Sequence, residues 1–75
     1  MIRYFFDIRD DAGLSIDEEG MLFGTQQEAE IEAATSLADM AKDLADIRQN
    51  VAVEVRTGTG SVFRAAFTFN RSKTN

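Results

Sequence analysis

The segment from Thr25 to Arg48 has the periodicity of one long amphipathic helix. Its apolar residues recur every three or four positions, which places them along one side of a helix. Thr25 is a suitable N-cap, and Glu28, three residues later, would complete a capping box with it. No glycine or proline interrupts the segment. We therefore expect one unbroken helix, packed on a surface supplied by the flanking segments.

This helix has two apolar rows. The first row consists of Ala33, Leu37, Met40, Leu44 and Ile47. The second row consists of Ile31, Ala34, Ala38, Ala41 and Ala45. Together they cover about half of the circumference, more than the ~100° that one packing partner needs. Either a curved sheet wraps the helix and covers both rows, or the second row meets another helix, most simply that of an identical chain. We predict the second row as a dimer interface, because small side chains let two helices approach closely.

The flanking segments alternate apolar and polar residues with a period of two, which is typical of β-strands. The predicted strands are 2–9, 14–17, 51–57 and 61–70. Residues 21–23 either extend the second strand after a bulge or form a small extra strand. Gly58-Thr59-Gly60 joins the last two strands as a hairpin loop.

These elements predict an α+β domain of the form ββαββ, a four-stranded sheet with one long helix on one face. Counting the four strands along the chain, the preferred order is 2-1-4-3, because the first and fourth strands are the longest and most aromatic. The alternative order is 2-1-3-4. The predicted core contains Tyr4, Phe6, Ile8, Leu22, Leu37, Met40, Leu44, Val53, Val55, Phe63, Phe67 and Phe69.

A chain of 75 residues is expected to form one domain, residues 1–75, with a frayed polar tail at 71–75. The sequence contains no cysteine and no histidine. This excludes disulfides, thiolate nucleophiles and metal sites built on thiolate or imidazole. Since a core this small seldom supplies more than about 3–5 kcal/mol, association with a second chain is the remaining source of stability. We expect a homodimer.

The location is expected to be cytoplasmic. The N-terminus lacks the basic and apolar regions of a signal peptide, and the lack of cysteine fits a reducing compartment. No apolar run approaches the length of a membrane span, so no membrane association is expected.

The net charge of −5 is unevenly distributed. Residues 1–47 hold twelve acidic and three basic residues, whereas residues 48–75 hold one acidic and five basic residues. An acidic chain disfavours nucleic-acid binding, which needs clustered Lys and Arg. The basic C-terminal part leaves a nucleic-acid or regulatory binding module as the alternative function, and attraction between the two parts as the simpler explanation.

Two sets of side chains are candidate sites. The acidic residues Asp10, Asp11, Asp17 and Glu19 are weak candidates for a metal site, since hard cations take oxygen ligands. Their spacing does not match an EF-hand, so solvated turns are the preferred interpretation. The second set is a possible ligand face on the outer side of the sheet, formed by Arg3, Phe5, Arg56 and Arg64. Two carboxylates on that face, Asp7 and Glu54, would repel phosphate.

Catalytic chemistry has little support in the sequence. The serines have no histidine to activate them, and Gly58-Thr59-Gly60 precedes a strand, not the helix that a phosphate loop requires. We predict no catalytic residues and no cofactor. The expected function is a small, non-enzymatic, dimeric protein-interaction module.

The runs Arg3-Tyr4-Phe5-Phe6-Asp7 and Asp17-Glu18-Glu19-Gly20, followed by the alanine-rich helix and residues 51–56, resemble a family of short bacterial proteins of unknown function. Members of this family are found largely in alphaproteobacteria and open with an R-Y-F-F-D strand. The resemblance covers nearly the whole chain, implies one small cytoplasmic domain, and assigns no activity. Members usually have an acidic residue and often a proline before the helix, where this chain has Phe23-Gly24-Thr25.

Overall fold

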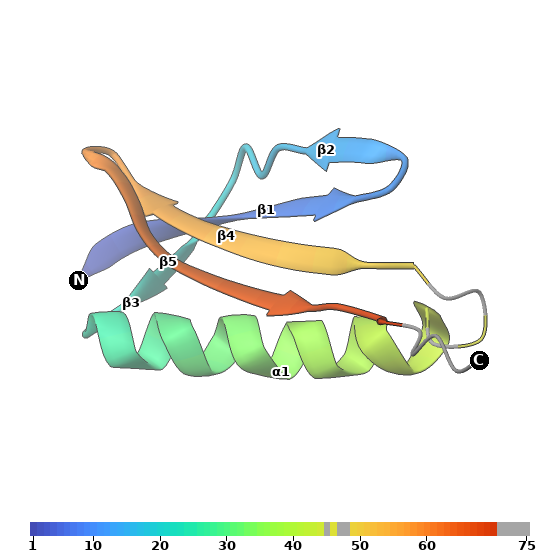
Figure 1. The fold of residues 1–75 in the computed structure, drawn as a ribbon. Helices are drawn as coiled ribbons and strands as arrows, with labels where there is room; N and C mark the ends of the chain where they lie inside the picture. Colours follow the sequence, from blue (N-terminus) through green and yellow to red (C-terminus); the bar gives the residue numbers. More distant parts are fainter. Residues whose placement is uncertain (45, 47–48, 71–75) are drawn as a thin grey trace, which may run out of the picture.

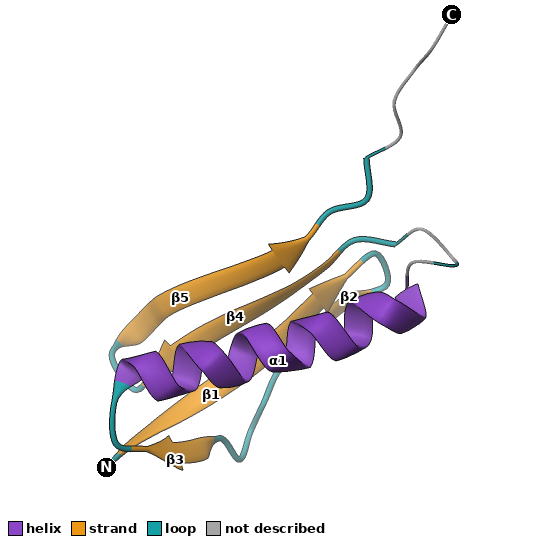
Figure 2. Cartoon of the chain, turned by 90° about the horizontal axis from the view of Figure 1, so that it is seen from below, coloured by secondary structure: helices purple, strands orange, loops and turns teal. Residues whose placement is uncertain are grey.

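The computed structural model of the chain describes residues 1–44, 46 and 49–70. In chain order its elements are β1 (Ile2–Asp10), β2 (Gly13–Ser15), β3 (Met21–Phe23), α1 (Gln26–Leu44), β4 (Val51–Thr57) and β5 (Gly60–Phe67). One helix packs on one face of an antiparallel sheet (Figure 1 and Figure 2), which confirms the predicted α+β class. Ala45, Ile47, Arg48 and the predicted tail at 71–75 lie outside the described residues.

The strand order is β2-β1-β4-β5, with β3 paired to β1 beside β2. The preferred order 2-1-4-3 is therefore wrong, and the alternative 2-1-3-4 is correct. The strand beside β1 is the valine- and alanine-rich β4, in which Val51, Ala52, Val53 and Val55 are all at most 4 % exposed. Compact side chains suit a strand covered by neighbours on both sides and by a helix. The longer phenylalanines of β5 lie at the edge, from where Phe63 still packs against the core.

The start of α1 follows the predicted capping box. Thr25 Oγ1 accepts a hydrogen bond from the Glu28 N–H at 3.2 Å, and Glu28 Oε1 accepts one from the Thr25 N–H at 3.0 Å. Glu28 Oε1 also accepts the Gly24 N–H at 3.0 Å. Three backbone donors that the helix itself leaves without partners are thereby satisfied.

The core lies between α1 and the middle of the sheet. Its fully covered members include Tyr4, Ala29, Ala33, Val53 and Val55. Partly buried side chains pack around them: Phe6, Ile8, Phe23, Leu37, Met40, Val62 and Phe63. Leu44, Phe67 and Phe69 are half-buried. The prediction was wrong for Leu22, which is 51 % exposed, because its pairing with Arg3 in β3 places it on the sheet face away from the helix.

β3 is a separate small strand, not an extension of β2. It pairs with Ile2–Tyr4 at the start of β1, whereas β2 pairs with Ile8–Asp10 at the end of β1. The Phe23 ring makes edge-to-face contacts with Tyr4 and Phe6, with ring centroids 6.1 and 6.0 Å away. These contacts hold β3 against β1 just before α1 begins.

Candidate interaction surfaces

The outer face of the sheet, opposite α1, carries a network of charged side chains, and no helix in the described part of the chain covers it. Asp7, on β1, is 6 % exposed and accepts a hydrogen bond from Arg56 Nε on β4 at 2.8 Å. The Arg56 guanidinium also lies over the Phe5 ring, 4.6 Å from its centroid. A buried carboxylate is thus neutralised by an arginine held in place by an aromatic ring.

Asp17 lies between β2 and β3 and connects that segment to β1. Its carboxylate accepts hydrogen bonds from the N–H groups of Phe6 at 3.0 Å, Gly20 at 3.0 Å and Glu19 at 3.1 Å. Its own N–H donates to Asp7 Oδ1 at 2.9 Å, and its carbonyl accepts from Arg56 Nη2 at 2.9 Å. Phe6 lies in the gap between the parts of β1 that pair with β3 and with β2. The Asp17 side chain therefore serves as the missing strand partner there.

These contacts lower the pKa of Asp17 below its ordinary value of 3.8. The hydrogen bond from the Phe6 N–H is the largest cause, and those from Gly20 and Glu19 and the charge of Arg56 act in the same direction. Partial burial of the carboxylate opposes them. Asp17 therefore stays ionised at neutral pH, as its role as a multiple acceptor requires.

The acidic residues predicted as weak metal candidates have structural roles at turns. Asp10 Oδ1 accepts the N–H groups of Ala12 at 2.8 Å and Gly13 at 3.1 Å, which closes the β1–β2 turn. Asp17 is engaged as described, and Asp11 and Glu19 are exposed. Among the described residues, no group of three or more carboxylates is arranged to hold a metal ion.

The four residues predicted as a possible ligand face share the outer side of the sheet, and contacts within the chain engage the three arginines among them. Arg56 binds Asp7 and the Asp17 carbonyl, Arg3 Nη1 donates to the Glu19 carbonyl at 2.8 Å, and Arg64 Nε donates to Glu54 at 3.3 Å. The last contact joins β5 to β4, since Glu54 and Arg64 lie opposite each other in the register of these strands. Phe5 is half-buried beneath Arg56, so its ring is not a bare stacking platform.

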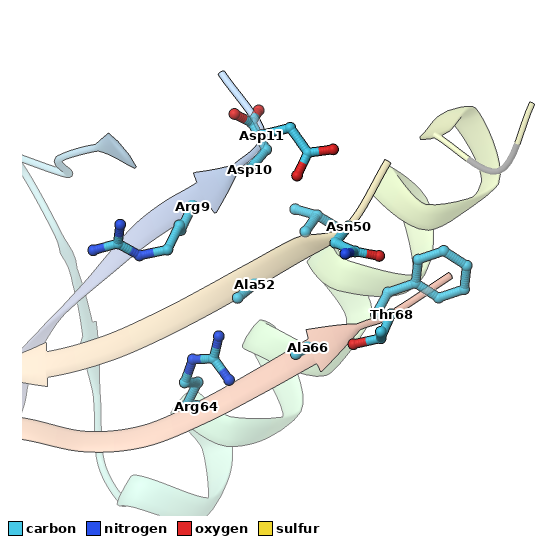
Figure 3. A pocket seen from close by; sticks show the side chains of 10 residues that line it. Arg9, Asp10, Asp11, Asn50, Ala52, Arg64, Ala66 and Thr68 are labelled. Atoms are coloured by element: carbon cyan, nitrogen blue, oxygen red, sulfur yellow. The ribbon is translucent and has the colours of Figure 1, made fainter. Parts of the chain in front are cut away.

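A hollow of about 230 Å³ lies on the same face, at the end of the sheet where β1 ends and β4 begins. Its floor includes Ala52 and Ala66, which face each other on β4 and β5. Figure 3 shows Arg9 and Arg64 on either side of these alanines, with Asp10 and Asp11 on the β1 side. The hollow arises because two methyl groups lie between long side chains. Both arginines also direct Nε to Glu54, at 3.9 and 3.3 Å.

The second apolar row of α1 faces away from the sheet. Ile31 is 60 % exposed, Ala34 and Ala38 are exposed, and Ala41 is half-buried. The first row is the one that packs on the sheet, with Ala33 completely covered. The expectation that a curved sheet covers both rows is therefore wrong, because the sheet reaches only one side of the helix. Ala45, the fifth predicted interface residue, lies outside the described residues.

The sequence analysis missed a group of exposed apolar side chains on the β2 and β3 side of the sheet. Its members, each between 43 % and 89 % exposed, are Met1, Ile2, Leu14, Ile16, Met21 and Leu22. Of these six, only Leu22 was predicted to lie in the core. The shortness of the segments at 14–16 and 21–23 was the available indication that they form a thin edge.

The family model for a domain of unknown function, DUF6894, matches residues 3–68. The chain belongs to this family. Compared with curated proteins and with solved structures, the chain matches none. Within the described residues, no helix combines the length and the apolar content needed to cross a membrane.

The two runs that suggested the family resemblance lie against each other in this DUF6894 domain. Arg3, Phe6 and Asp7 of the first run bind backbone or side-chain atoms of Asp17 and Glu19 in the second. Gly20, which ends the second run, has a φ of +71°. A Cβ atom there would lie 2.8 Å from the Tyr4 carbonyl oxygen, so the close approach of the two runs requires glycine. The two runs therefore hold β1 against the segment between β2 and β3. This structural role explains the presence of both runs without a catalytic role.

Proposed function

We propose that this DUF6894 domain is a non-enzymatic interaction module that acts by binding another protein chain, and first of all a second copy of itself. The observation that carries the proposal is the exposed second row of α1. Ile31 is 60 % exposed on a helix whose opposite side, at Ala29 and Ala33, is completely covered. A helix that is apolar on two sides needs a second packing partner, and the sheet of its own chain supplies only one.

Binding is favoured over catalysis by the way the polar groups are used. The chain has no histidine and no cysteine. Two carboxylates of the outer face, Asp7 and Asp17, are occupied by arginine and backbone N–H groups. Groups committed to holding strands together are poorly placed to move protons or attack a substrate. A cytoplasmic location and a bacterial origin belong to the same proposal.

The oligomeric state tests this proposal. Sedimentation equilibrium from low to high micromolar concentration should show a monomer–dimer equilibrium. Ala34→Gln should weaken the dimer by about tenfold, because a longer polar side chain separates the two surfaces. Asp39→Gln, at an exposed position of the same helix, is the matched control and should leave the equilibrium unchanged. A monomer at every concentration would contradict the proposal.

Binding of nucleic acid through the basic C-terminal part stays a prediction, and the geometry supports it less. The arginines expected to contact phosphate, Arg56 and Arg64, are paired with Asp7 and Glu54. A probe would have to displace these partners before it gained a contact. Retention of single-stranded or duplex probes that falls steeply with salt would favour this alternative.

A further inference from the structure

The outer edge of β5 is an open strand edge. β5 ends the strand order, and among the described residues no strand pairs with its far side. Figure 2 shows β5 at the border of the sheet, with no other element beyond it. Natural proteins protect such edges with proline, inward-pointing lysine, bulges or a covering segment. β5 contains neither proline nor lysine, and its one charged residue, Arg64, is paired with Glu54 on the outer face. Its irregularity is confined to the start of the strand, where Val62 is the extra residue.

The sequence of this edge is complementary to itself. Residues 63–67 read Phe-Arg-Ala-Ala-Phe. When two copies pair antiparallel around Ala65, Phe63 of each lies opposite Phe67 of the other, and Arg64 lies opposite Ala66. Two aromatic cross-strand pairs then form on the helix side, where both rings are only half-buried in one chain. On the outer side each arginine faces a methyl group, so no like charges lie directly opposite each other.

The position of α1 fits the same arrangement. The helix packs on β4 and β5, and Gln26, which contacts Glu30 at 2.8 Å and the Val62 carbonyl at 3.4 Å, marks the helix side that lies next to β5. At 3.6 residues per turn, Ala34 and Ala41 lie about 80° and 60° from Gln26 around the helix, whereas Ile31 and Ala38 lie about 140° and 120° from it. The alanines of the second row that are nearest to the β5 edge are therefore these two.

Pairing the two β5 edges would bring the two helices together. Both would lie on one face of the joined sheet and run antiparallel. A helix above the line between β4 and β5 would lie about 10 Å from its counterpart, which is two strand spacings. This agrees with the roughly 8–10 Å between packed helix axes, where small side chains are needed at the contact.

We propose that β5 pairs antiparallel with β5 of a second copy, in the register centred on Ala65, and that the helix flanks at Ala34 and Ala41 adjoin across the same axis. This inference rests on the proposed function and specifies its interface. The partner is a second copy because the edge is complementary to its own sequence in length, aromatic residues and charge.

Opposite charges introduced at Ala66 test the register. Ala66 is exposed on the outer face, so neither Ala66→Glu nor Ala66→Lys places a charge in the core. In the proposed register Ala66→Glu faces Arg64 of the second copy and should tighten the dimer about three- to tenfold, whereas Ala66→Lys should weaken it by a similar factor. The matched controls Ala12→Glu and Ala12→Lys change an exposed alanine at the far side of the sheet and should leave the dimer Kd unchanged.

A single cysteine tests the geometry independently, because the chain contains none. Ala65→Cys should be cross-linked to a covalent dimer by a short thiol-bridging reagent such as dibromobimane, since the two thiols meet at the symmetry axis. Thr59→Cys, in the hairpin loop before β5, should not. Thermal unfolding followed by circular dichroism checks that every variant is folded.

The possible outcomes separate the two proposals. A dimer with opposite effects at Ala66 and a cross-link at Ala65 supports the pairing of β5. A dimer that responds equally to both charges, with no cross-link at Ala65, overturns this pairing and leaves the proposed self-association standing. A wild-type chain that is monomeric at every concentration overturns both, including when β5 instead binds an extended segment of a different protein.

Discussion

The two sides of this sheet differ in whether further strands of the same chain are added to them. On the β1 side, β3 pairs with the first part of β1 and β2 with the last part. Asp17 fills the gap between them by accepting the Phe6 N–H. At the β5 edge, no described strand takes the corresponding position.

The difference shows how a short chain can hold its own strands together on one side of the sheet and leave the other side open to a second chain. On the β1 side the chain adds a charged side chain and two strands of three residues each, β2 and β3, which are the outermost strands there. Strands this short are poor templates for another strand. Among the described residues no strand pairs with the far side of β5, a strand of eight residues, and the proposed dimer depends on that contrast.

Removing the Asp17 carboxylate should cause the largest loss of stability on the β1 side of the sheet. Asp17→Ala takes the acceptor from three backbone N–H groups, and about 1 kcal/mol for each predicts a loss of about 3 kcal/mol in the free energy of unfolding. Urea denaturation measures it. Glu18→Ala, at an exposed neighbouring position, is the control and should cost less than about 0.5 kcal/mol. Equal effects of the two substitutions would show that Asp17 does not close the edge.

The close contact at Gly20 should give the next largest effect. Gly20→Ala places a methyl group 2.8 Å from a backbone oxygen at a φ of +71°, so about 2–3 kcal/mol of stability should be lost. Gly58→Ala is the matched control, since a Cβ there meets nothing within 4 Å. A Gly20→Ala variant as stable as the wild type would mean that the two runs are less closely joined than the structure indicates.

Arg56 and Arg64, two arginines of the outer face, differ in how much stability their ion pairs contribute. Arg56→Ala leaves Asp7, only 6 % exposed, without its cation, and should cost about 2 kcal/mol. Arg64→Ala breaks an ion pair whose arginine side chain is 58 % exposed, and should cost less than about 0.5 kcal/mol. Chemical denaturation in low salt compares them. Similar losses of stability for the two variants would contradict the conclusion that Arg56, and not Arg64, stabilises the β1 side of the sheet.

The smallest effect should appear in the pH dependence. Because the pKa of Asp17 is lower in the folded chain than its ordinary value of 3.8, the unfolded chain takes up the proton first as the pH falls. The stability that Asp17 contributes is therefore complete above pH 3.8 and is lost as the pH falls through the lowered value. Thermal melts of the wild type should lose Tm more steeply below about pH 4 than those of Asp17→Asn. Parallel profiles would argue against the lowered pKa.

Much of the candidate interface could be predicted, because helical periodicity is a local property. The spacing of Ile31, Ala34 and Ala38 identified a second apolar row, and the structure leaves these three residues exposed. The role of Asp17 could not be predicted in the same way. Its carboxylate binds Phe6, eleven positions earlier in the chain, and the sequence contains nothing to distinguish it from an ordinary turn aspartate. The open β5 edge was equally inaccessible, since it follows from the strand order.

The sequence by itself determined the element types, the capping box at Thr25 and Glu28, and the side of the long strands β1, β4 and β5 that faces the helix. These follow from interactions between residues a few positions apart and from the periods of helix and strand. Only the tertiary structure decided that β4 lies next to β1 and that β5 lies at the edge. Alternation along a strand is the same in either order, so the choice depends on how valine, alanine and phenylalanine side chains fill the space beneath one helix.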